Sequence, residues 1–182
     1  MITHMMEPTP TQIIEALPHV HYEIEALLLT PKHTPDLAET VYFWKMAHGR
    51  VLFTFFSTEK CKRFADDVLS LDFGFPAEPL YGNDPKPLLD LFNKRLFHLT
   101  YSRIQEKDEW LMDKLLSPVM RQSRKFIDYM LQLTTITIDD NERHRWRDLK
   151  NADARGLPLQ QNTSNIAHYQ IQIIESNRGT DR

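Results

Sequence analysis

The stretch that decides the fold is DLAETVYFWKMAHGRVLFTFF, residues 36–56. Its apolar residues recur at steps of three or four, which is the spacing of one face of an α-helix. The main stripe consists of Leu37, Val41, Trp44, His48, Leu52 and Phe55. Tyr42, Phe43, Met46 and Phe53 cover much of the opposite face. A helix that is hydrophobic almost all round is typical of a bundle centre or of an interface, and a homodimer is one simple explanation.

The segments on either side of this helix favour the same fold class. Helical spacing of apolar residues continues through residues 11–29, 85–105 and 108–133, and the whole chain has only 5 glycines. We expect Pro18 to kink the first of these helices and Pro118 to kink or divide the last. Residues 60–82 read as an irregular connection, with a short helical turn around residues 64–69. The sequence therefore predicts an all-α bundle of four to five helices.

Chain length and composition indicate one domain followed by a tail. A chain of 182 residues is long enough for one sizeable core. We expect the helical bundle to occupy residues 1–134 and a polar tail to occupy residues 135–182. Three arrangements of this tail stay open: disorder, a strand added to a partner, and docking back onto the bundle.

Charge and cysteine content exclude several classes of protein. The formal net charge of -3 argues against broad adhesion to nucleic acid or anionic lipid, so a polyanion would have to bind in a focused cleft. Cys61 is the only cysteine, which rules out an intramolecular disulfide and a thiolate metal cage. No apolar run reaches the roughly 18 residues of a membrane span, and no signal-peptide core is seen. We expect a cytoplasmic protein without a membrane partner, a metal or a cofactor.

The candidate chemistry lies in NKRLFHLTYSR, residues 93–103. Imidazole has its ordinary pKa near physiological pH, so His98 beside cationic side chains can accept a proton next to an anion-stabilising group. On an ideal helix Arg95 is a neighbour of His98. Asn93 falls on the other flank, so its cooperation with His98 requires a second chain or a distorted helix.

Four segments carry a resemblance to a known family: residues 19–24, 47–53, 65–68 and 93–103. In their order and spacing they resemble small bacterial HEPN-like helical proteins. The resemblance implies a bundle that is commonly dimeric, and often a metal-independent ribonuclease of a toxin–antitoxin or phage-defence system. It implies RNA as substrate and an antitoxin or other protein as a partner, which we place on the tail. The residues it points to are His98, Asn93 and Arg95 for catalysis, and His48, Arg50 and Arg103 for substrate binding.

The motif departs from the family pattern at one position. Phe92 stands where the family has an arginine, and an aromatic ring cannot stabilise a pentavalent phosphate. Arg95, or Arg50 from the preceding long helix, is a candidate substitute. Whether the chain is an enzyme stays open: it is a ribonuclease, or a nuclease-derived RNA-binding subunit. The alternative is a non-catalytic helical module for dimerisation or protein interaction.

Each candidate residue also has a structural interpretation. His48 replaces an apolar residue on a packing stripe, which favours a buried, hydrogen-bonded histidine. Arg50 and Arg103 are candidates to pair with Asp66 and Asp67, which would tie the long connection to the bundle. A metal site made of His48, His98 and Asp67 has no recognised ligand spacing behind it, so we expect none.

Overall fold

The structure of the chain is a computed structural model that describes residues 8–29, 38–57, 67–80, 90, 93, 112–134, 136 and 138–156. Its α-helices are α1 (Pro10–Leu28), α2 (Ala38–Phe55), α5 (Met112–Gln132) and α6 (Asp140–Ala154). A short 3-10 helix, η3, spans Ser70–Phe73. The described ranges contain no strand. The all-α helical bundle predicted from the sequence is confirmed.

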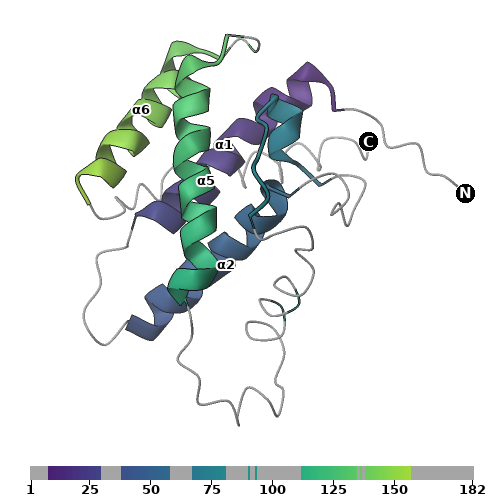
Figure 1. Ribbon diagram of the computed structural model, residues 1–182. Helices are drawn as coiled ribbons and strands as arrows, with labels where there is room; N and C mark the ends of the chain where they lie inside the picture. The colour runs from purple at the N-terminus through teal and green to yellow at the C-terminus, as the bar shows by residue number, and fades with distance from the viewer. Residues whose placement is uncertain are drawn as a thin grey trace, which may run out of the picture.

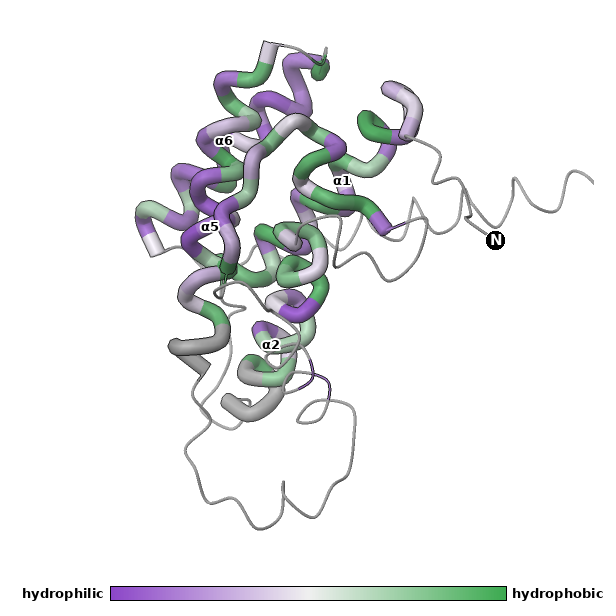
Figure 2. The backbone as a smooth tube through the Cα atoms, turned by 45° about the vertical axis from the view of Figure 1, so that its right-hand side comes forward, coloured by the Kyte–Doolittle hydropathy of each residue, from purple (hydrophilic) through white to green (hydrophobic). Residues whose placement is uncertain are grey.

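The helices pack around one hydrophobic core. Helix α1 contacts α2, α5 and α6, while α5 also contacts α2 and α6. In Figure 1, α5 crosses in front of α1, and α6 runs alongside α5. Figure 2 shows hydrophobic residues concentrated in α1 and α2 and mainly hydrophilic residues along α6. Helices α1 and α5 each contact the three other α-helices, so these two helices form the centre of the bundle.

Helix α1 begins at a capping box. The Gln12 backbone N–H donates to Thr9 Oγ1 at 3.3 Å, and the Thr9 backbone N–H donates to Gln12 Oε1 at 2.9 Å. Pro10 follows the cap, where its missing N–H costs nothing. The helix then continues through Pro18. Helix α5 likewise continues through Pro118, so the expected division of that helix does not occur.

Phe126 of α5 is the centre of an aromatic cluster. Its side chain is fully buried. Edge-on rings with centroids within 6.1 Å of its own come from α2, the η3 segment and α6: Phe55, Phe56, Phe73, Phe75 and Trp146. Edge-to-face pairs are a favourable ring geometry. The cluster therefore joins three parts of the chain to α5.

The connection after α2 forms η3; of the turn expected at residues 64–69, residues 67–69 are not helical, and residues 64–66 lie outside the described residues. The Leu69 backbone N–H donates to an oxygen of Asp72 at 2.7 Å. Gly74 ends the turn with a φ of 75°, a conformation that glycine adopts without strain. The Tyr129 hydroxyl donates to the Phe73 carbonyl at 2.9 Å, so α5 holds this connection in place.

Helix α6 was not predicted from the sequence, and it shows that the first part of the tail docks back onto the bundle. Trp146 and Leu149 are buried in the common core. Asp139 caps the helix by accepting from the Glu142 backbone N–H at 2.7 Å. Arg143 donates to the Leu131 carbonyl at 3.3 Å, at the end of α5. The bundle thus extends beyond residue 134, whereas residues 157–182 lie outside the described residues.

Gly49 lies where α2 crosses its neighbours. A Cβ atom built at this position would collide with the side chain of Leu116 in α5 and would touch Leu27 of α1. Both leucines are buried. Only glycine lets α2 approach α5 this closely with Leu116 in its present place.

His21 joins α1 to α6. Its Nε2–H donates to the Arg145 carbonyl at 3.2 Å, and its ring meets Trp146 edge-to-face at a centroid distance of 4.8 Å. Glu25 Oε2 is 3.9 Å from Nδ1, too far for a hydrogen bond. Burial, and then the charge of Arg145, lower the pKa of His21 from 6.5 to about 4. The imidazole is therefore neutral at pH 7.

This buried histidine predicts a loss of stability in mild acid. Between pH 6.5 and pH 4 the unfolded state binds more protons at His21 than the folded state, so the free energy of unfolding rises with pH. The contribution is complete above pH 6.5 and is lost as the pH falls towards 4. Wild type should lose about 2 kcal/mol more than His21→Leu between pH 7.5 and pH 5, as measured by urea unfolding. Equal losses in the two proteins would contradict this assignment.

Candidate functional site

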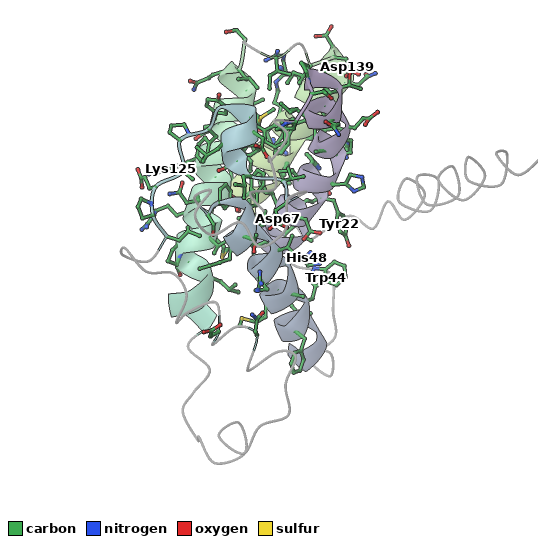
Figure 3. All side chains as sticks on the ribbon, turned by 90° about the vertical axis from the view of Figure 1, so that its right-hand side faces the viewer. Tyr22, Trp44, His48, Asp67, Lys125 and Asp139 are labelled. Carbon is green, nitrogen blue, oxygen red and sulfur yellow. The ribbon has the colours of Figure 1, made fainter. Side chains whose placement is uncertain are left out.

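His48 lies in a polar contact between α1 and α2. Its Nδ1–H donates to Glu23 Oε2 at 2.7 Å, since a carboxylate can only accept. Its ring meets Trp44 and Tyr22 edge-on, with centroid distances of 4.5 and 5.5 Å. Figure 3 shows these three rings grouped together. This is the hydrogen-bonded, largely buried arrangement that the structural interpretation of His48 expects.

The same contact is fixed by a second bond. Trp44 Nε1–H donates to the Ala26 carbonyl at 3.1 Å, near the end of α1. Trp44 and His48 are four residues apart, so they share one face of α2. This face is used to hold α1 against α2.

Arg50 connects α2 to the candidate motif. Its Nε–H donates to Asn93 Oδ1 at 3.0 Å, and its Nη1 donates to Thr54 Oγ1 at 2.6 Å. Asn93 is helical, as the motif segment was expected to be. The two bonds hold the guanidinium in one orientation beside the motif asparagine.

The structure describes half of the residues that the sequence singled out. His48, Arg50 and Asn93 are described, and of these the structure joins Arg50 to Asn93. His48 points instead to Glu23. His98, Arg95 and Arg103, together with Phe92, lie outside the described residues.

An open hollow of about 470 Å³ lies between α1, α2 and the chain before η3, and Arg50 is on its wall. Its apolar lining consists of Ala16, Val20, Val51, Leu52, Phe55 and Val68. Its polar lining consists of His19, Glu23, Arg50, Thr54 and Asp67. Val51 and Val68 are 49% and 43% exposed, so solvent reaches them. The hollow thus sets a cation, an imidazole, a hydroxyl and carboxylates around an apolar floor.

Sequence reasoning missed His19, Glu23 and Thr54 as parts of this site. A signal was present, because His19 and Glu23 are four residues apart and share one face of α1. Arg50 and Thr54 show the same spacing on α2. What the sequence does not show is that these two faces meet.

A second charged cluster ties α5 to α6. Arg124 makes two bonds to the Asp153 carboxylate, Nε to Oδ2 at 2.7 Å and Nη2 to Oδ1 at 3.0 Å. The pKa of Lys45 is lowered by burial and then by the charge of Arg124, while Asp153 opposes the shift. Because its charges are paired across two packed helices, this cluster is structural.

The described residues include no group of three or more His, Cys, Asp or Glu side chains that could hold a metal ion. Among the helices that the structure describes, none is long and apolar enough to cross a membrane. Comparison with known proteins gave no match to a protein-family model, to a curated protein or to a solved structure. Fold and site together define a helical bundle with an arginine at the edge of an open, mostly apolar hollow.

Proposed function

We propose that this chain is a HEPN-like RNA-binding protein that cleaves RNA without a metal ion, within a bacterial toxin–antitoxin or defence system. The observation that carries the proposal is the 3.0 Å hydrogen bond from Arg50 Nε to Asn93 Oδ1. In the family pattern an arginine directly precedes the polar residue, and here Phe92 occupies that place. Arg50 supplies a guanidinium to the same asparagine from the neighbouring helix.

The chemistry follows from the residue types. The 2′-hydroxyl of RNA attacks the adjacent phosphorus as a base removes its proton, and the 5′-oxygen leaves as it receives a proton. His98 is the group proposed to move these protons. Arg50 is proposed to stabilise the extra negative charge of the phosphorane. Because RNA carries its own nucleophile, this route requires no metal ion.

The fixed orientation of Arg50 supports this role. A guanidinium held by two hydrogen bonds does not have to be ordered when the phosphorane forms, which makes its electrostatic contribution larger. Arginine is also always charged and matches the geometry of a phosphate, which suits it to this role.

The oligomeric state and partners belong to the same proposal. Pairing of motif helices in a homodimer brings two sets of motif residues to one cleft. We place the antitoxin or other protein partner on the C-terminal tail, and the protein in the cytoplasm.

Cleavage of mixed cellular RNA in EDTA tests the proposal. Wild type should cleave, and His98→Ala and Arg50→Ala should each reduce the rate by about 100-fold or more. Arg121→Ala is the matched control, since Arg121 is exposed on α5 and is no part of the hollow. Size-exclusion mass measured in parallel gives the oligomeric state. Undiminished cleavage by Arg50→Ala would remove Arg50 from the mechanism.

A non-catalytic interaction module is the second candidate. The exposed side chains of Val51 and Val68 in the hollow favour it, because apolar groups that face solvent often mark a binding surface. A folded wild-type protein that cleaves no RNA would support this second function over the first.

A further inference from the structure

We infer that the hollow beside Arg50 is the subsite for one nucleobase of the RNA strand, and that it prefers guanine. The inference rests on the proposed function, which brings RNA to Arg50. The motif residues do not determine which nucleotide is seated next to the phosphate, and the inference concerns this choice. The hollow itself, with its lining from α1, α2 and residues 67–68, carries the argument.

The apolar lining fits the faces of a flat base. Val51 and Val68 present aliphatic surface to solvent within the hollow, and Phe55 and Leu52 are buried behind them. A volume of about 470 Å³ lies within the range of small-ligand pockets, roughly 300–1,000 Å³. Proteins that read RNA commonly take up an unstacked base and bond to its edges.

The polar lining selects among the bases. Two carboxylates, those of Glu23 and Asp67, stand in the hollow and act as acceptors. Guanine presents a ring N–H and an amino group side by side, so it can donate two parallel hydrogen bonds to one carboxylate. Uracil presents a single N–H between two carbonyl oxygens, which a carboxylate repels. The acceptors therefore favour guanine over uracil.

The bond that Glu23 makes within the protein leaves it acceptor capacity for a ligand. Glu23 Oε2 already accepts from His48. A carboxylate has about four lone-pair positions, so Glu23 can keep its bond to His48 and still accept from a base. The bond to His48 fixes the direction of the Glu23 carboxylate.

The charges place the base inside the hollow and the phosphate outside it. The lining carries one guanidinium, that of Arg50, and two carboxylates, those of Glu23 and Asp67, so a phosphate deep in the hollow would meet repulsion. Arg50 bonds to Asn93, and so it reaches towards the motif segment. We take the seated guanine to be the base of the nucleotide whose 2′-hydroxyl attacks, so its own 3′-phosphate lies beside the guanidinium. This predicts cleavage on the 3′ side of guanosine.

The test measures binding of 3′-GMP and of 3′-UMP to the full-length protein in EDTA. NMR titration gives the two dissociation constants. 3′-GMP should bind at least about tenfold more tightly than 3′-UMP, a difference of about 1.4 kcal/mol. Asp67→Asn should reduce this preference to about threefold or less, because the amide presents a donor as well as an acceptor. Glu23→Gln tests the second carboxylate in the same way.

Filling the hollow gives a second, independent variant. Val51→Trp should abolish binding of both nucleotides, since the indole ring would fill the space above the buried side chains of Leu52 and Phe55. Leu71→Trp is the matched control: Leu71 is 40% exposed, comparable with Val51, but does not line the hollow. Thermal unfolding of each variant establishes that it is folded.

The outcomes separate this inference from the proposed function. Equal binding of the two nucleotides, no binding of either, or wild-type binding by a folded Val51→Trp would overturn the guanine subsite. RNA cleavage without base preference would also overturn the guanine subsite, but it would support the proposed ribonuclease activity. Preferential binding of 3′-GMP by a protein that cleaves no RNA would support the subsite and remove the catalytic function.

Discussion

Replacement of Phe126 by alanine is expected to lower the free energy of unfolding by about 3–5 kcal/mol. The ring is fully buried, and it contacts aromatic rings from α2, from the η3 segment and from α6. Its removal leaves a cavity in contact with three parts of the chain, and no single neighbour can collapse to fill it. Because domains are stable by only about 5–15 kcal/mol, the variant should be only marginally folded.

Urea unfolding followed by far-ultraviolet circular dichroism measures this effect. Phe43→Ala is the matched control, because Phe43 loses the same atoms from a ring that is 40% exposed. Its cost should be about 1 kcal/mol. Similar costs for the two variants would show that the aromatic cluster is not the principal packing centre. Phe126→Leu provides a folded variant in which most of the buried volume is kept.

Trp146→Ala should cost about 3–5 kcal/mol and should release α6. Trp146 is fully buried, and its ring meets His21 of α1 and Phe126 of α5. Leu149 is the only other buried side chain of α6. Without the indole, the helix keeps Leu149 and its polar bonds, which should be too little to hold it closed against the bundle.

Limited proteolysis and hydrogen exchange detect this release as faster cleavage and exchange within residues 140–154. Arg147→Ala is the control, since Arg147 is the exposed next residue of the same helix. Trp146→Phe should cost less than the alanine variant. The buried indole N–H has no hydrogen-bond partner among the described residues, so its removal also removes a desolvation penalty. Unchanged protection of α6 in Trp146→Ala would contradict its role as an anchor.

Helices whose apolar spacing was strong could be predicted from the sequence. Residues 11–29 and 108–133 were expected to be helical, and α1 spans Pro10–Leu28 and α5 spans Met112–Gln132. Both helices continue through a proline that was expected to disturb them. A proline removes one backbone bond and kinks a helix locally, and burial of the flanking residues Leu17 and Val119 can outweigh that cost.

Helix α6 escaped prediction because tertiary packing, rather than composition, stabilises it. Asp139 was a readable capping residue, and Trp146 and Leu149 have helical spacing, but the rest of the helix is mainly polar and charged. Such a segment is marginal alone and becomes a helix when a core receives its few apolar side chains. The same limit applies to the candidate site. Spacing placed Arg50 on α2, but only the packing of the helices brings it to Asn93 and sets Glu23 and Asp67 around a shared hollow.

Three successive residues of α2, centred on Gly49, face three different parts of the protein. Successive residues of a helix point about 100° apart. His48 therefore turns to Glu23 of α1, Gly49 to Leu116 of α5, and Arg50 to Asn93. Alanine would be favoured over glycine by about 1 kcal/mol in an isolated helix, so the chain gives up local helix strength for contact at this crossing. A side chain at position 49 would require Leu116 to change its conformation or α2 to shift, and a shift of α2 would move both His48 and Arg50 relative to their partners.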